Sequence, residues 1–285
     1  MNFKLNLLAA AALMAASAPT FAAMADATSG NGELLVNLRF YTGDNNSGGD
    51  DISAVFDTGI TMNAYLADKT LINGIDLTSA NYGNAWNTVM AFAGANTAAI
   101  EYNIIALDNT NSNTAGGARY LTTFAGATFP SLPNQNLNNF SFMNSYVTLN
   151  NSRGTHATEV NGASTATSSD AQNTYFGKVN GGLTDGDNWS VQTTADTTRT
   201  LGTAQNFWFL TTSSTSTTAQ ATKSPFGIDL NGDGKISTAL EFDNVLVSTT
   251  GQLSYVAAVP EASTYGMMLA GLGLVGFMAR RRLAA

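Results

Sequence analysis

Apolar and polar residues alternate along several short stretches of the chain, and this is the pattern of β-strands with two different faces. Residues 32–41 alternate most regularly, and their two faces hold Leu34, Val36, Leu38 and Phe40 against Glu33, Asn37 and Arg39. Residues 100–106 repeat the pattern. Further strands are predicted at 53–57, 120–124, 146–149, 174–176, 206–211, 242–248 and 253–256.

The segments between these strands indicate the fold class. Gly, Asn, Asp and Ser separate the short strands, which predicts an all-β body, a sandwich or jelly-roll-like fold. The last two strands are expected to form a hairpin through residues 249–252, and helices are expected at 84–93 and near 137–146. Residues 211–222 are nearly low-complexity and predict a surface loop or a polar edge strand. A division into two domains near residue 150 stays open.

The first 25 residues have the layout of a secretory signal peptide. Lys4 supplies the positive start, and residues 7–16 form an apolar run of suitable length. Small residues then offer two cleavage points, one after Ala22 and one after Ala25. We therefore predict a signal peptide at 1–25, followed by a β-rich extracytoplasmic body at 26–258.

The last segment, residues 259–285, has three parts. A short motif comes first, formed by Val259, Pro260, Glu261, Ala262 and Ser263. The fifteen residues 265–279 carry no charge, and as a helix they would span about 22 Å. Arg280, Arg281 and Arg282 follow. A membrane span needs about 20 apolar residues, so this transmembrane helix is short, and the clustered arginines place its end in the cytoplasm.

These three parts in this order resemble the PEP-CTERM sorting signal, although Ala262 stands where a second proline is usual. The resemblance implies an exported protein of a Gram-negative bacterium that makes extracellular polysaccharide. It also implies that a membrane transpeptidase-like enzyme, the exosortase, recognises and cleaves the tail. The expected partners are thus an exosortase and, transiently, the inner membrane, with release to the cell surface or the extracellular space. The resemblance concerns an address and says nothing of an activity of the body.

Composition restricts the partners of the body. The chain has no cysteine, so no disulfide bonds can stabilise the exported protein. Its net charge is -8, and the body alone is more acidic because Lys4 and the three terminal arginines lie in the two end segments. An acidic surface repels nucleic acid, so no nucleic-acid partner is expected.

The sequence DLNGDGKIS from Asp229 to Ser237 is the strongest local motif of the body. Alternate oxygen-bearing residues and the glycine at the sixth position match the first half of an EF-hand-like or dockerin-type calcium loop. The candidate ligands of Ca²⁺ are Asp229, Asn231, Asp233, the Lys235 carbonyl, Ser237 and Glu241. Leu240 occupies the twelfth position in place of the usual glutamate. The alternative is a plain Asn-Gly and Asp-Gly turn that holds no metal.

Other candidate sites are weaker. The acidic residues at 44, 50 and 51, and those at 185 and 187, fit solvated loops or turns better than a second cation site. His156 is the chain's single histidine and is expected to be exposed in a loop. A catalytic zinc usually needs several His or Cys ligands, and no serine lies in a Gly-x-Ser-x-Gly elbow. No catalytic residues are therefore assigned, and an enzyme is not expected.

Three functions are consistent with these features. The first is an exported structural protein of the cell surface or of an exopolysaccharide matrix in a biofilm, sorted and cleaved at its C-terminal signal. The second is a β-sandwich module that binds carbohydrate with the help of calcium, in which Trp86, Trp189, Trp208 and tyrosines could stack on sugars. The third, a secreted polysaccharide hydrolase with a pair of carboxylates such as Glu159 and Glu241, has the weakest support.

Overall fold

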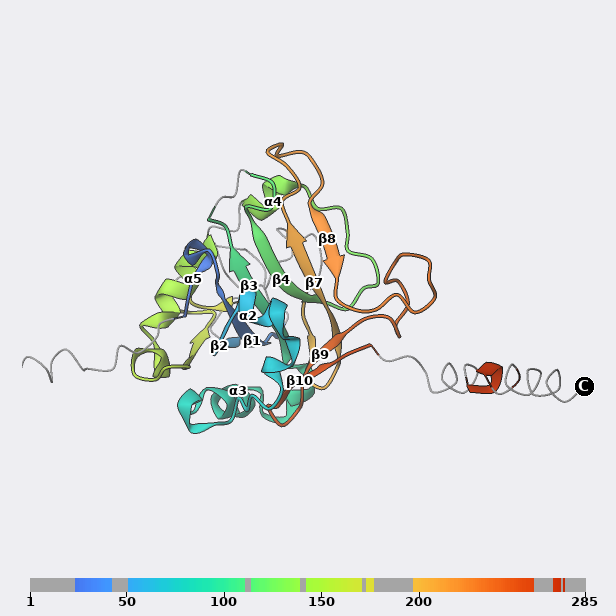
Figure 1. Ribbon diagram of the computed structural model, residues 1–285. Coiled ribbons are helices and arrows are strands. Elements are labelled where there is room, and N and C mark those ends of the chain that lie inside the picture. The colour runs from blue at the N-terminus through green and yellow to red at the C-terminus, as the bar shows by residue number, and fades with distance from the viewer. Residues whose placement is uncertain are drawn as a thin grey trace, which may run out of the picture.

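A computed structural model describes residues 24–42, 51–110, 114–138, 142–170, 173–176, 197–258, 269–272 and 274. Within this part of the chain the strands form one ten-stranded sheet in the order β10-β9-β7-β4-β3-β1-β2-β5, with β6 added to β3 and β8 added to β7. The pairings between neighbouring strands are antiparallel. The sheet curls into a half-barrel, and the few helices lie around it (Figure 1). The predicted all-β class is confirmed.

The strands are β1 (Glu33–Phe40), β2 (Ile52–Thr61), β3 (Glu101–Asp108), β4 (Arg119–Phe124), β5 (Ala163–Thr167), β6 (Arg199–Thr200), β7 (Gln205–Thr211), β8 (Thr222–Pro225), β9 (Asn244–Val247) and β10 (Leu253–Val256). The α-helices are α2 (Met62–Ala67), α3 (Ala85–Ala93), α4 (Asn134–Asn138) and α5 (Phe142–Asn151). Short 3₁₀ helices are η1 (Ala27–Ser29), η2 (Lys69–Ile72), η3 (Ala80–Tyr82), η4 (Gly94–Ala99) and η6 (Gly154–Ala157).

One face of the sheet packs against α2 and α3. Leu34, Val36 and Leu38 of β1 are fully buried in one apolar cluster, together with Trp86 and Val89 of α3. These are the apolar positions of the alternating stretch, so the predicted core face of β1 is confirmed. Each fully buried aliphatic side chain contributes about 1.5–3 kcal/mol, and this cluster therefore fixes the register of β1 against its neighbours.

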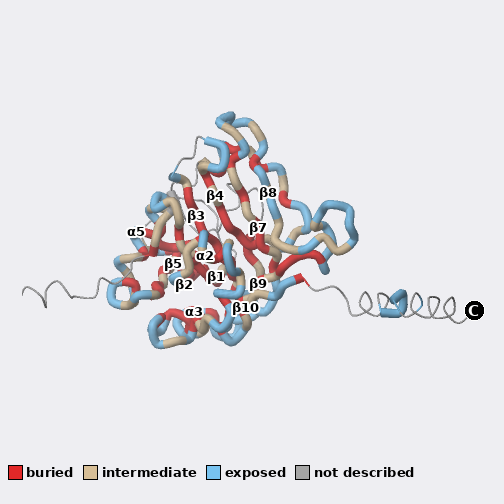
Figure 2. Tube along the Cα trace, in the orientation of Figure 1, coloured by how far each residue is buried: buried red, intermediate tan, exposed pale blue. Residues whose placement is uncertain are grey.

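The opposite face is also covered. Leu35 of β1, Val55 of β2 and Ile105 of β3 belong to a second apolar cluster with Tyr146 and Val147 of α5. The central strands are consequently buried on both faces, as the tube drawing shows (Figure 2). A layer on each face means that the middle of the sheet is shielded from water.

The polar positions of β1 make hydrogen bonds inside this second layer instead of facing solvent. Asn37 is 1% exposed, accepts a hydrogen bond from the Tyr146 hydroxyl at 2.7 Å, and donates one to Asn103 Oδ1 at 3.0 Å. Arg39 forms an ion pair with Glu101 at 2.7 Å. Alternation correctly separated the two faces, but it could not indicate that α5 covers the polar one.

Several predicted elements are confirmed, among them the helix at 84–93 and the hairpin formed by β9 and β10. The strand predicted at 146–149 is wrong, because these residues belong to α5. Its buried residues Tyr146, Val147 and Asn150 follow helical spacing, whereas Leu149 is 38% exposed. The strand predicted at 174–176 is also absent from the described chain. Residues 211–222 run from the end of β7 into β8, which pairs with β7 outside the main path of the sheet.

The predicted signal peptide lies almost entirely outside the described residues, as do Val259–Ser263 and the three terminal arginines. No helix in the described part of the chain is both long enough and apolar enough to span a membrane. The uncharged run at 265–279 is described only at 269–272 and 274, where Leu269, Leu272 and Leu274 are more than 60% exposed.

Candidate functional site

The acidic motif forms a compact loop between β8 and β9. An isolated bridge between Gly227 and Phe242 closes the base of the loop. The Asp229 carboxylate lies across the turn, because one oxygen accepts a hydrogen bond from the Gly232 amide and the other from the Gly234 amide, both at 2.7 Å. This carboxylate therefore organises the loop backbone from its first position.

Two further side chains continue this pattern. Asn231 Oδ1 accepts a hydrogen bond from the Asp233 amide at 2.9 Å, and Asp233 Oδ1 accepts one from the Lys235 amide at 2.8 Å. Gly232 and Gly234 have φ angles of 77° and 79°, in the left-handed region that glycine adopts without steric cost. The three side chains that were proposed as metal ligands thus alternate around one tight turn.

Glu241, which follows the motif along the chain, stabilises the loop through its side chain. The residue is 1% exposed. Its Oε2 accepts hydrogen bonds from the Ser237 and Thr238 amides at 2.8 Å each, and its Oε1 accepts one from the Leu230 amide at 3.3 Å. Donation from the Ser237 amide, followed by that from Thr238, lowers the pKa of Glu241 to about 2. Sequence reasoning proposed Glu241 as a ligand, and the structure also gives it this second role as a cap for three backbone amides.

The structure brings some of the candidate ligands closer together than others. Asp229, Asn231 and Asp233 line the same turn, while Glu241 is occupied with backbone amides. Leu240, at the twelfth position, is 52% exposed. Within the described residues, no three His, Cys, Asp or Glu side chains gather into a metal-binding group. Asn and backbone carbonyl oxygens would have to complete a calcium site here, as they do in EF-hand loops.

A cleft of about 610 Å³ adjoins this loop. Phe129 and Trp208 form its apolar wall, Lys223 lies at its side, and Asp229 and Lys235 of the loop border it. Trp208 is only 4% exposed, with its ring centroid 5.5 Å from that of Phe129. Trp208 is therefore a core residue that also forms part of the cleft wall. Local sequence patterns do not indicate the cleft, because its walls come from segments far apart along the chain.

The other candidate residues are placed differently. His156 is 3% exposed, so the expectation of an exposed loop histidine is wrong. Gly162 packs against the backbone of this residue so closely that an added Cβ would lie 2.4 Å from the His156 amide nitrogen. Desolvation lowers the pKa of His156 to about 4. Asp51 is buried and accepts a hydrogen bond from the Thr42 amide at 2.8 Å, whereas residues 44, 50, 185 and 187 lie outside the described chain.

Asp57 and Glu33 form a pair of carboxyl groups that sequence patterns do not predict. Asp57 of β2 is 1% exposed, and its side chain interacts with that of Glu33 at the start of β1. Burial is the main cause that raises the pKa of Asp57 to about 8; the charge of Glu33 adds to it, and the Gly59 amide opposes it. Asp57 is therefore mostly protonated at neutral pH. The offset in register between Glu33 and Leu35 on β1 was the feature that sequence could not reveal.

The β-rich body ends in a short clamp. The buried Asp243 carboxylate accepts a hydrogen bond from the Ala258 amide at 2.8 Å and another from the Tyr255 hydroxyl at 2.6 Å. The chain is held in place as far as Ala258, and the predicted sorting segment begins at the next residue.

Comparison with protein-family models identifies this next segment. The model for the PEP-CTERM protein-sorting motif matches residues 258–282, a range that contains the residues from Val259 to Ser263 and the three arginines. The chain is therefore an exported protein that is sorted at its C-terminus, as expected of an exosortase substrate, with membrane anchoring before processing. No curated protein and no solved structure matches the chain.

Proposed function

We propose that this protein is a structural component of the cell surface or of an exopolysaccharide matrix, delivered there by cleavage of its C-terminal sorting signal. The observation that carries the proposal is the PEP-CTERM motif, which directly follows a folded β-rich body. Exosortase and the inner membrane act as transient partners, and exopolysaccharide is the partner after release. The proposal assigns no catalytic activity to the body.

Fractionation of the native host tests this proposal. The wild-type body is expected in the extracellular or surface-polysaccharide fraction, without the residues that follow its processing site. Replacing Arg280, Arg281 and Arg282 together by alanine removes the positive charge that fixes the orientation of the tail, so the variant should fail to reach that fraction. Lys235→Gln, which removes an exposed charge from the body, is the control and should be delivered normally. Delivery of the triple variant at the wild-type level would contradict the proposal.

A second candidate function is a carbohydrate-binding module assisted by Ca²⁺. What supports it is the position of the cleft beside the acidic loop, since Asp229 and Lys235 belong to both. Sugar-binding sites commonly combine an apolar aromatic wall with a few polar groups. A cation held by Asp229, Asn231 and Asp233 would stiffen the rim of this cleft.

Calorimetric titration separates this second candidate from the first. CaCl₂ is added first, and soluble exopolysaccharide is then titrated with and without a chelator. Asp233→Asn should weaken the calcium response, because asparagine keeps the Oδ1 acceptor for the Lys235 amide but removes the charge. Asp68→Asn is the matched control, since Asp68 is an exposed residue with the same type of turn, accepting from the Thr70 amide at 2.9 Å. Absence of any polysaccharide binding would exclude the second candidate and leave the sorting proposal intact.

A further inference from the structure

The first described residue, Met24, is part of the folded body. Its side chain is 3% exposed and lies in the second apolar cluster, together with Leu35 of β1, Tyr146 and Val147. A methionine buried among side chains from β1 and α5 is a core residue, and a discarded leader would have no such role. The body therefore extends at least two residues before Asp26, the start that the sequence predicted.

The backbone of Met24 is held as firmly as its side chain. Its amide donates a hydrogen bond to Asn151 Oδ1 at 2.9 Å, and its carbonyl accepts one from Asn151 Nδ2 at 3.1 Å. One asparagine at the end of α5 thus pairs with both polar groups of the residue. Without Met24, both ends of this side-chain amide would lose their protein partner.

Ala25 continues the attachment. Its amide donates to Glu33 Oε2 at 2.8 Å, and its carbonyl accepts from the Glu33 amide at 3.2 Å. This pairing also holds Glu33 in position beside Asp57. Ala25 is therefore connected to the carboxyl pair at the start of β1 and β2.

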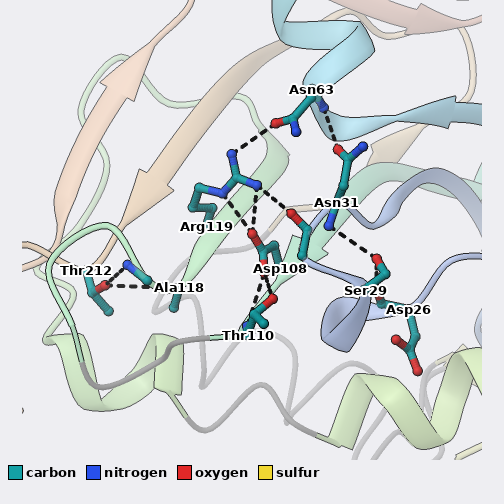
Figure 3. A network of polar contacts seen from close by, with 11 residues as sticks. Asp26, Ser29, Asn31, Asn63, Asp108, Thr110, Ala118, Arg119 and Thr212 are labelled. Atoms are coloured by element: carbon teal, nitrogen blue, oxygen red, sulfur yellow. Dashed lines mark hydrogen bonds and ion pairs between the residues drawn. The ribbon is translucent and has the colours of Figure 1, made fainter.

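The residues that follow Ala25 are fixed to the body as well (Figure 3). Arg119 of β4 donates to the Gly30 carbonyl at 2.7 Å and forms an ion pair with Asp108 at 2.7 Å. Asn31 Oδ1 accepts a hydrogen bond from the Asn63 amide at 2.8 Å. The segment from Met24 to Asn31 thus contacts α5, β1, β4 and α2.

Both candidate cleavage points place small residues before the scissile bond, so the sequence alone leaves the choice open. The contacts of Met24 and Ala25 distinguish between them. Cleavage after Ala25 would remove Met24 from the core and break the pairings with Asn151 and Glu33. Cleavage after Ala22 would leave all of them in the mature chain. We propose that signal peptidase hydrolyses the peptide bond between Ala22 and Ala23. Water adds across this bond, leaving a carboxylate on Ala22 and an ammonium group on Ala23, the first residue of the mature protein.

N-terminal sequencing and intact-mass analysis of the exported protein test this inference directly. A mature chain that begins with Ala-Met-Ala-Asp is expected. A chain that begins at Asp26 would overturn the inference while leaving the sorting proposal untouched, because export would still have occurred. A chain that still begins at Met1 in the cell envelope or outside the cell would overturn the cleavage itself.

Two precursor variants make the test independent of a single measurement. Ala22→Leu places a bulky side chain next to the proposed scissile bond, so unprocessed precursor should accumulate and the Ala23 start should disappear. Ala25→Leu makes the same change at the alternative point and should leave the Ala23 start unchanged. The N-terminus is read on all recovered protein, soluble or aggregated, so that impaired folding of Ala25→Leu does not obscure the result. The reverse pattern, with Ala25→Leu blocking processing, would contradict the inference.

Discussion

The buried carboxyl group of Asp57 should make the stability of this protein fall as pH rises above neutrality. Burial and the nearby Glu33 raise the folded-state pKa of Asp57 to about 8, from its ordinary value of 3.8. The native state therefore binds more protons than the unfolded chain between these two values, and its free energy of unfolding decreases with increasing pH. The stabilisation is fully present below pH 4 and is lost as pH rises through 8.

The size of the effect follows from proton linkage. One extra proton in the native state gives a slope of at most about 1.4 kcal/mol per pH unit. His156, whose folded pKa is lowered to about 4, gives a slope of the opposite sign below about pH 6.5. The contribution of Asp57 is therefore separated from that of His156 between about pH 6.5 and 8, where Asp57 should reduce the free energy of unfolding by up to about 2 kcal/mol. For a domain of this size, that corresponds to a Tm lower by roughly 4–8 °C.

Thermal unfolding of wild type and of Asp57→Asn across this window is the assay. Asparagine keeps the Oδ1 acceptor for the Gly59 amide, 2.9 Å away, and can donate its amide hydrogens to Glu33 without ever ionising. The two proteins should differ little at pH 6.5, and the variant should be the more stable one at pH 8. Asp68→Asn, an exposed change whose wild-type pKa is lowered, should follow the wild-type curve. Parallel curves for wild type and Asp57→Asn would refute the reasoning.

Three further predictions concern single side chains. Met24→Ala should reduce the free energy of unfolding by about 2–5 kcal/mol because it empties a core position, whereas Leu149→Ala, 38% exposed in α5, should cost much less; urea unfolding measures both. Glu241→Gln should speed hydrogen exchange at residues 230–238. Because the folded pKa of Glu241 is lowered to about 2, wild type is expected to lose loop protection as pH falls from 4.5 toward 2, and the variant should not; equal exchange in both proteins would contradict this. Arg119→Ala should cost roughly 1.5–3 kcal/mol through the charged hydrogen bonds it removes, and more than Arg153→Ala, whose side chain is 33% exposed; equal losses would refute the ranking.

Sequence patterns predicted the elements whose signals are local. The apolar side of β1, the helix α3 and the hairpin of β9 and β10 each follow from residues that are close together along the chain. The alternating oxygens of Asp229, Asn231 and Asp233 likewise placed the acidic turn correctly.

What sequence patterns missed depends on distant partners. Tyr146 and Val147 have aromatic and β-branched side chains that favour a strand, but they pack as one side of a helix over β1. The cleft beside the acidic loop requires Phe129, Trp208 and Lys235 to meet across more than 100 residues of chain. Met24 belonged by composition to a leader, and its burial in the second apolar cluster and its hydrogen bonds with Asn151 identify it as part of the body.

The clamp on the end of the body has a consequence for processing. Asp243 fixes both Tyr255 and the Ala258 amide, and a single residue then separates Ala258 from Pro260. A fully extended chain covers at most about 7 Å over those two steps. The precursor thus has almost no spacer between its folded body and the sorting signal. The exosortase must therefore accommodate the folded body close to the bond that it cleaves, or cut before the last strand has docked.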